Sequence, residues 1–189
     1  GRCVALEALI RWNRTDGTSV SPSLIASVCE ERGMMGALTQ FVLNSALRNQ
    51  RLWAGQGLDL AVSINLSPTI LADAAFPILV SHALSTWNVP GDRLTLELTE
   101  SAIAQNEQSA IDFMKQLREL GCHLSMDDFG TGYSSIEWFR KLPLNELKID
   151  RSFVRELEGA EREPADGTVR ALIDLAHAFR LRALAEAVE

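Results

Sequence analysis

The stretch LTLELTESAIAQNEQSAIDFMKQLRELGCHLSMDDFG, residues 94–130, contains two β-type runs separated by a segment of helical periodicity. Within that segment apolar residues recur at steps of three, which indicates the buried face of one helix. They are Ile111, Met114, Leu117 and Leu120. Gly121 follows them and is a natural helix stop. A strand, a helix and a second strand in this order predict an α/β arrangement with parallel strands.

Further β-type runs stand on both sides of this unit. They are VALEALIRW (4–12), LAVSINLS (60–67), ELKID (146–150) and ALAEAVE (183–189). Helical periodicity separates the runs, and the last helical stripe, from Val169 to Phe179, has Asp166 as its expected N-cap. The charged residues 156–164 predict an exposed loop before that helix. The alternation predicts an α/β fold with a mainly parallel sheet.

Length and composition favour one domain over residues 1–189. A chain of 189 residues with 47% hydrophobic composition can bury one core and is short for two. No apolar run approaches the roughly 18 residues that cross a bilayer, and the N-terminal region does not resemble a secretory signal. We therefore expect a cytoplasmic domain without direct membrane contact, whether or not a longer parent protein is anchored in a membrane.

The formal net charge of −7 argues against DNA binding, which depends on many lysine and arginine contacts to phosphates. An anionic substrate would need local neutralisation by metal ions or by a few cationic side chains. The three cysteines, Cys3, Cys29 and Cys122, lack C-x-x-C spacing, which disfavours a disulfide framework or a zinc site. We expect them to be buried free thiols.

Acidic and amide side chains stand at or near the C-terminal ends of five of the β-type runs, while Glu7 lies inside its run. They are Asn65, Glu97, Glu100, Asp127, Asp128, Asp150, Glu186 and Glu189, with Lys148 beside Asp150. A single such acid could equally cap a helix or pair with an arginine. In a parallel barrel, however, these strand ends converge on the face where active sites are built. A ring of carboxylates needs cations, and oxygen ligands suit Mg²⁺ or Mn²⁺.

The adjacent pair Asp127 and Asp128 is the sharpest part of this pattern. Successive strand residues point to opposite faces, so both acids can serve one site only where the strand ends and the backbone turns. Gly130 and Gly132 permit such a turn. Residues 128–130 also spell the metal-binding tripeptide of protein kinases, but the other kinase motifs are missing from the sequence. Kinase and dinucleotide-binding functions are therefore excluded.

Six motifs in order resemble those of the EAL domain family of cyclic di-GMP-specific phosphodiesterases. They are EALIRW (7–12), SINLS (63–67), LELTE (96–100), DDFGTGYSS (127–135), LKID (147–150) and AEAVE (185–189). The resemblance implies a (β/α)8 TIM-like barrel. We expect this chain to leave the barrel incomplete at both ends, without the first strand and without the last strand and its helix. The motifs depart from the family at Ala187, where glycine is usual.

The resemblance also implies two Mg²⁺ or Mn²⁺ ions per site. The residues that match metal ligands are Glu7, Asn65, Glu97, Asp127, Asp128 and Glu186. Those that match catalytic residues are Lys148, Glu7, Asp127, Asp128 and Glu189, and those that match substrate contacts are Arg11, Leu9 and Asp150. Glu100 is similar to the residue that steadies the loop from Asp128 to Ser135. In the family that loop couples metal binding to dimerisation, so a homodimer is implied.

The implied function is hydrolysis of cyclic di-GMP to the linear dinucleotide in bacterial second-messenger signalling. Two divalent ions about 3.5–4 Å apart can bind both the attacking and the leaving oxygen of an in-line displacement. The alternative is a weak or inactive EAL domain that serves as a cyclic di-GMP receptor or a regulatory dimerisation module. In either case the resemblance implies fusion to sensory or GGDEF domains in the parent protein.

Overall fold

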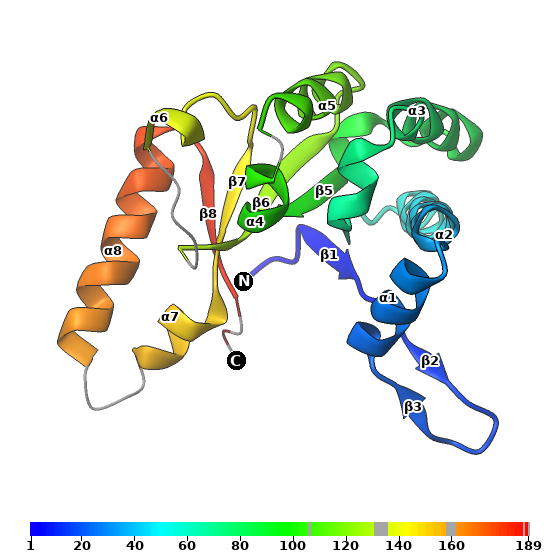
Figure 1. Cartoon of the computed structure of the whole chain (residues 1–189), viewed down its shortest axis with the longest axis horizontal. Helices are drawn as coiled ribbons and strands as arrows, with labels where there is room; N and C mark the ends of the chain where they lie inside the picture. Colours follow the sequence, from blue (N-terminus) through cyan, green and yellow to red (C-terminus); the bar gives the residue numbers. More distant parts are fainter. Residues whose placement is uncertain (106, 131–135, 158–161, 187, 189) are drawn as a thin grey trace.

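The computed structural model describes residues 1–105, 107–130, 136–157, 162–186 and 188. Within these residues, six strands form one sheet in which every neighbouring pair is parallel. In sheet order they are β1 (Ala5–Ala8), β4 (Ala61–Asn65), β5 (Leu94–Thr99), β6 (His123–Phe129), β7 (Glu146–Ile149) and β8 (Arg182–Ala185). The sheet curls, with β1 and β8 at its two edges (Figure 1).

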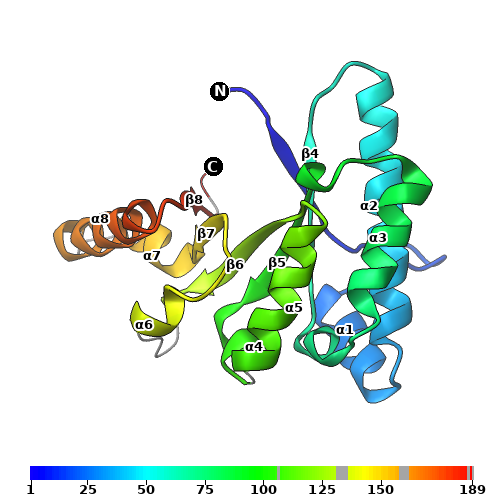
Figure 2. The ribbon, with the colours of Figure 1, turned by 90° about the horizontal axis from the view of Figure 1, so that it is seen from above.

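Helices cover the outer side of the curled sheet, as Figures 1 and 2 show. The helices are α1 (Pro22–Glu31), α2 (Met35–Gly55), α3 (Phe76–Trp87), α4 (Glu100–Ala104), α5 (Glu107–Glu119), α6 (Ile136–Phe139), α7 (Arg151–Glu156) and α8 (Arg162–Ala178). Two short 3₁₀ turns, η1 (Pro68–Ala72) and η2 (Gly91–Arg93), precede α3 and β5. The predicted α/β fold with a parallel sheet is confirmed, and its arrangement is that of a partial barrel.

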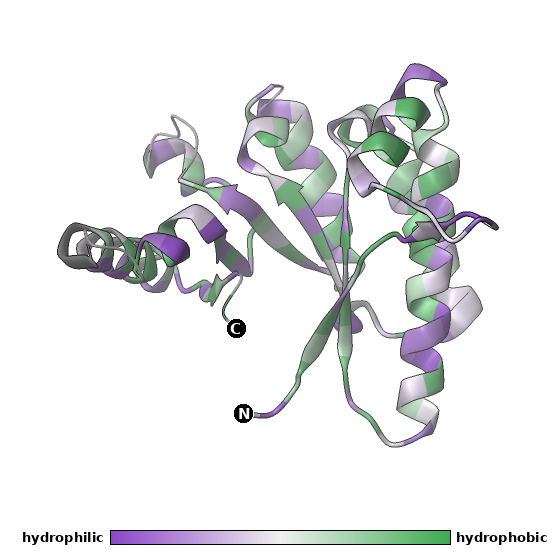
Figure 3. Cartoon of the chain, turned by 90° about the horizontal axis from the view of Figure 1, so that it is seen from below, coloured by the Kyte–Doolittle hydropathy of each residue, from purple (hydrophilic) through white to green (hydrophobic). Residues whose placement is uncertain are grey.

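The two faces of the sheet differ in chemistry. The residues that face the helices are apolar and almost fully buried: Val62, Ile64, Leu96, Leu98, Leu124, Met126 and Leu147. The alternate residues of the same strands face the inside of the curl and are polar: Ser63, Thr95, Glu97, Ser125, Glu146 and Lys148. The green and purple bands along the strands in Figure 3 follow this alternation. The hydrophobic core therefore lies between sheet and helices, and the inner face is left for polar groups.

Some local predictions hold and others are wrong. Gly121 follows α5 with a φ of +84°, a conformation that glycine adopts without strain. Asp166, however, is not an N-cap, because α8 already begins at Arg162. Its carboxylate instead accepts from Arg170 Nε at 2.8 Å, one helical turn later. The predicted loop over residues 156–164 is correspondingly shorter, and residues 158–161 lie outside the described part of the chain.

The first β-type run is also divided differently from the prediction. Strand β1 ends at Ala8, and Trp12 belongs to a separate antiparallel hairpin of β2 (Trp12–Asn13) and β3 (Ser19–Val20). Leu9 and Arg11 lie in the connection between them. With the strand ending at Ala8, Glu7 is its penultimate residue and lies near its C-terminal end, as the other acids do.

The expectation of three buried thiols is wrong for two of them. Only Cys122 is buried, and burial raises its pKa to about 12, whereas Cys3 is exposed and Cys29 is partly exposed. All three are free. Among the described residues, no helix has both the length and the apolar composition needed to cross a bilayer.

Candidate active site

Lys148 lies at the centre of the site. Its Nζ atom lies 2.9 Å from Glu97 Oε2, 3.2 Å from Asp127 Oδ1 and 2.7 Å from Glu186 Oε1. The three acids come from β5, from β6 and from the residue after β8, so the ammonium joins side chains that are far apart in sequence. The Lys148 side chain is only 4% exposed. A lysine this buried needs close anions to remain charged.

Lys148 and the acids around it shift one another's pKa values. Although burial disfavours the ammonium, its hydrogen bonds with Glu186 and Glu97 raise the pKa of Lys148. Burial raises the pKa of Glu97, and Lys148 only partly offsets that effect. Burial likewise raises the pKa of Glu186, with the Asp127 charge adding to the shift. Lys148 therefore stays protonated. Its single positive charge does not balance the negative charges of the three acids around it.

Asp127 and Asp128 reach the same side of the sheet because the backbone turns at Asp128. That residue has a φ of +54°, and the pairing of β6 with β7 shifts register between Met126 and Phe129. The turn predicted here therefore begins at Asp128 itself, before Gly130. Ligand oxygens of Asp127, Asp128 and Glu186 lie within 4.8 Å of one another. Burial and the neighbouring Asp127 charge raise the pKa of Asp128.

Strand β4 links two further glutamates to this group. Asn65 Nδ2 donates to Glu7 Oε1 at 2.7 Å. Asn65 stands directly beside Glu97 in the sheet, and Ser63 stands directly beside Glu7. We call Glu7, Glu97, Asp127, Asp128 and Glu186 the acidic rim.

Glu100 anchors the segment that follows the acid pair. It begins α4 directly after β5 and is buried, and its Oε2 accepts from the backbone N–H of Gly130 at 3.3 Å. The Phe153 ring packs against another side of Gly130. If residue 130 carried a Cβ atom, that atom would lie 3.0 Å from the ring. Residues 131–135, through which dimerisation was predicted, lie outside the described part of the chain.

Other residues expected at the site are less closely joined to it. Arg11 is exposed, and its Nη1 donates to the adjacent Ile10 carbonyl at 2.9 Å, while Leu9 is half exposed. Asp150 caps α7 by accepting from Ser152 N at 2.9 Å, and hydrogen bonds from the Ser152 hydroxyl and from this backbone N–H hold the pKa of its carboxyl low. Glu189 and Ala187 lie outside the described residues.

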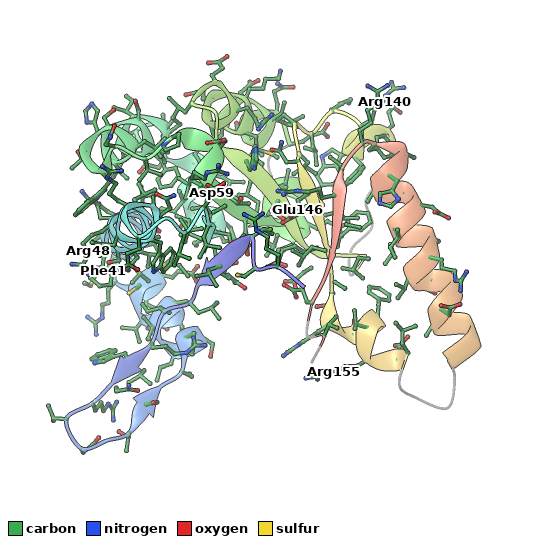
Figure 4. All side chains as sticks on the ribbon, turned by 180° about the vertical axis from the view of Figure 1, so that it is seen from behind. Phe41, Arg48, Asp59, Arg140, Glu146 and Arg155 are labelled. Carbon is green, nitrogen blue, oxygen red and sulfur yellow. The ribbon has the colours of Figure 1, made fainter. Side chains whose placement is uncertain are left out.

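Sequence reasoning assigned no role to a second polar group on the same inner face. Ser125 Oγ donates to Glu146 Oε1 at 3.1 Å, and Arg182 Nη2 lies 3.5 Å from Glu146 Oε2. We call these three residues the lower cluster. The name refers to the N-terminal ends of the strands, at or near which they lie, and not to a position in the figures. In Figure 4, Glu146 lies at the start of β7 and Arg155 lies on α7, beyond the other end of that strand. The signal that could have revealed it is spacing: Glu146 is two residues before Lys148, on the same face.

The donor atoms of the acidic rim fit divalent metal ions. The rim offers carboxylate oxygens, and Asn65 can add an amide oxygen, a donor set that suits Mg²⁺ or Mn²⁺. Five rim carboxylates stand against the ammonium of Lys148, and burial raises the pKa values of Glu97, Asp128 and Glu186. Further positive charge would therefore stabilise the rim.

Comparisons with known proteins agree with this chemistry. The family model described as "EAL domain" matches residues 1–189. The chain is 37% identical over 190 residues to "Cyclic di-GMP phosphodiesterase NbdA" of Pseudomonas aeruginosa, covering all of this chain and 24% of that protein. It is 34% identical over 190 residues to "Bifunctional diguanylate cyclase/cyclic di-GMP phosphodiesterase MucR" of the same organism, covering all of this chain and 27% of that protein. The chain thus spans about a quarter of these relatives.

A solved structure shows the same architecture. The structure "PaMucR Phosphodiesterase, c-di-GMP complex" superposes with a TM-score of 0.93 at 34% sequence identity. The match covers 100% of this chain and 76% of that one. The arrangement of strands and helices described above therefore matches that of a solved phosphodiesterase structure.

Proposed function

Because this chain belongs to the EAL domain family, we propose that it is the catalytic part of a phosphodiesterase that hydrolyses cyclic di-GMP to the linear dinucleotide. One observation carries the proposal: a buried lysine lies within 3.2 Å of three carboxylates, from β5, from β6 and from the residue after β8. Such a cluster at the C-terminal face of a parallel barrel is positioned for catalysis. The name of the MucR structure, a phosphodiesterase in complex with c-di-GMP, supports the substrate.

Two Mg²⁺ or Mn²⁺ ions would be held by the acidic rim together with Asn65. When bound, the two ions stabilise the attacking and leaving oxygens of an in-line phosphoryl displacement. The rim side chains contribute negative charge in fixed positions, because Lys148 and Asn65 each hold a rim carboxylate by a hydrogen bond. Glu189 is proposed to complete the site.

Lys148 acts in this proposal as a fixed positive charge. Its raised pKa keeps the ammonium protonated at neutral pH, so it donates a hydrogen bond and does not accept a proton. A buried positive charge of this kind stabilises negative charge that develops on the phosphoryl oxygens in the transition state. Its three carboxylate partners hold it in place, so little reorganisation is needed when the substrate reacts.

Substrate contacts are proposed at the border of the site. The Arg11 guanidinium can hold a phosphate of cyclic di-GMP through two parallel hydrogen bonds, once its bond to the Ile10 carbonyl is exchanged. Leu9 offers an exposed apolar side chain beside it. Asp150 offers a carboxylate that already caps α7 and is therefore held in one orientation.

The wider setting is proposed from the relatives. The name of MucR combines a diguanylate cyclase with a phosphodiesterase, and the chain spans about a quarter of that protein. We therefore propose that residues 1–189 act as one EAL domain beside GGDEF or sensory domains. We also propose a cytoplasmic location and a homodimer formed through the loop after Asp128.

The test is turnover by the full-length protein. Incubation with cyclic di-GMP and Mn²⁺ should yield the linear dinucleotide, detected by chromatography, and EDTA should stop the reaction. Cyclic di-GMP binding without any linear product would contradict the proposal and indicate a receptor.

A further inference from the structure

Helix α2, which is 21 residues long, has one face in the core and another in solvent. Leu43 and Leu47 lie on the buried face. On the opposite side, residues that recur at steps of three and four form a second stripe, which we call the outer face of α2. They are Met34, Ala37, Phe41, Ser45, Arg48 and Leu52. The Phe41 side chain is 64% exposed, and Met34 and Leu52 are also more than half exposed.

A furrow lies beside the outer face of α2. It is lined by Phe41, Arg48 and other residues of α2, and by Trp87 at the end of α3. The Trp87 indole N–H donates to Asn44 Oδ1 at 3.0 Å, which holds the ring in place as one wall of the furrow. In Figure 4, Phe41 and Arg48 lie next to one another on the outside of α2. Aromatic residues and arginine are enriched in protein interfaces, so the furrow has the composition of a protein-binding surface.

The outer face of α2 is cationic although the chain as a whole is acidic. Residues 33–58 contain Arg48 and Arg51 and no aspartate or glutamate, whereas the chain has 25 acidic residues against 18 lysines and arginines. Both arginines are exposed, and within the described part of the chain neither guanidinium has an ion-pair or hydrogen-bond partner. Unpaired guanidinium groups beside an apolar stripe are complementary to the carboxylates of a binding partner.

We infer that the outer face of α2 is a docking site for an acidic amphipathic helix of a partner protein. Exposed apolar residues at steps of three and four form the kind of stripe along which a second helix packs. Such a helix can place apolar side chains against Phe41, Trp87 and Leu52, with an aspartate or glutamate beside Arg48. The inference goes beyond the proposed function, because this face belongs to neither the acidic rim nor the lower cluster.

Two other occupants fit this face less well. A second copy of the chain would bring its own α2, which carries the same arginines and no acid to pair with them. An anionic membrane attracts clusters of about four to eight basic residues, whereas this face has two and the chain carries a net charge of −7. Charge complementarity therefore favours an acidic partner helix.

The experiment measures binding of two labelled synthetic peptides to the full-length protein by fluorescence anisotropy. Both peptides are helical, match the 21 residues of α2 in length and carry leucines at steps of three and four. One has glutamates beside the leucines, and the other has lysines at the same positions. The glutamate peptide should bind saturably and about 10-fold more tightly than the lysine peptide. Phe41→Ala should weaken binding of the glutamate peptide by about 10-fold, because it removes an aromatic anchor.

Charge reversal at Arg48 gives a sharper readout. Arg48→Glu should weaken binding of the glutamate peptide by about 5-fold and tighten binding of the lysine peptide, a reversal that unfolding cannot produce. The matched control is Arg140→Glu, since Arg140 is also exposed and lies on the opposite side of the view from Arg48 in Figure 4. The control variant should bind both peptides as the wild type does. Turnover of cyclic di-GMP should be unchanged in all three variants.

Several results would overturn the inference. They are the absence of saturable binding by the glutamate peptide, equal affinity for the two peptides, and equal effects of Arg48→Glu and Arg140→Glu. A dimer in analytical ultracentrifugation that Phe41→Ala abolishes would assign the face to a second copy instead. Sedimentation with anionic phospholipid vesicles that Phe41→Ala abolishes would assign it to a membrane. Wild-type protein that binds the glutamate peptide without hydrolysing cyclic di-GMP would support the inference and contradict the proposed function.

Discussion

The acidic rim and the lower cluster are built on the same strands but differ in charge balance. In the lower cluster one carboxylate, Glu146, is matched by a serine hydroxyl and by Arg182, whose side chain is 60% exposed. At the other end, Lys148 is 4% exposed and faces three carboxylates at once. The lower cluster satisfies its own charge, whereas the rim carries an excess of negative charge that a ligand must offset.

This difference indicates which end stabilises the fold and which end does chemistry. In parallel barrels, polar groups at the N-terminal face contribute to stability and those at the C-terminal face to catalysis. In the rim, burial raises the pKa values of Glu97, Asp128 and Glu186. Rim substitutions should therefore affect metal binding and turnover, and lower-cluster substitutions should affect stability.

The largest effect is expected from Asp127→Asn. The change removes a charge that contacts Lys148 at 3.2 Å and shares the group with Asp128 and Glu186. Loss of metal-assisted charge stabilisation of several kcal/mol should lower kcat for cyclic di-GMP by about 10³-fold. The control is Glu146→Gln, the same carboxylate-to-amide change in the lower cluster. Similar losses of kcat in both variants would remove the distinction between the two ends.

A smaller loss of turnover is expected from Lys148→Met. Removing one fixed donor for a developing negative charge should lower kcat by about 10²-fold. Mn²⁺ binding should be retained, because the rim carboxylates stay and lose their competing cation. Arg182→Met is the matched control, since it removes the cation of the lower cluster and should leave kcat unchanged. Calorimetry that shows loss of Mn²⁺ binding by Lys148→Met would contradict its assignment as a charge stabiliser.

Glu146→Ala should change stability and leave chemistry intact. The substitution leaves the fully buried Ser125 hydroxyl without its acceptor, which should lower the free energy of unfolding by about 1–3 kcal/mol. Urea denaturation followed by circular dichroism measures this change. Mn²⁺ affinity that fell together with stability would show that the two clusters are coupled.

The smallest effect is expected in the pH dependence of the increase in Tm that Mn²⁺ produces. The pKa values of Glu97, Asp128 and Glu186 are raised on folding, so their contribution to stability is fullest below their ordinary values of 3.8 to 4.5. It is lost as pH rises through the raised values and the acids ionise. Bound Mn²⁺ favours the ionised acids, so the increase in Tm on adding Mn²⁺ should be greater at pH 8 than at pH 5. An equal increase at both pH values would argue against metal binding at the rim.

The sequence predicted the strands and the rim because both depend on short-range patterns. The β-type runs alternated with helical stripes, and the acids stood where those runs end, so parallel pairing was enough to bring Glu97, Asp127 and Glu186 together. The turn that gathers Asp127 and Asp128 was predicted from their adjacency and from Gly130 and Gly132 after them. The individual roles of these side chains remain predictions.

The parts that were missed depend on contacts that one strand cannot reveal. The start of α8 at Arg162 contradicts the capping role of Asp166, because Asp166 satisfies its charge with Arg170 along the helix. The hairpin of β2 and β3 forms through pairing of Trp12 with Val20. Strands of two residues are too short to show a β-type pattern in the sequence.

The most direct test is a crystal structure of the protein soaked in Mn²⁺, with anomalous scattering used to locate the metal. The account predicts manganese peaks within about 2.0–2.6 Å of carboxylate oxygens of Asp127, Asp128 and Glu186, the distances at which hard cations bind oxygen. Anomalous peaks confined to other surfaces, with the rim carboxylates still paired only with Lys148, would contradict it.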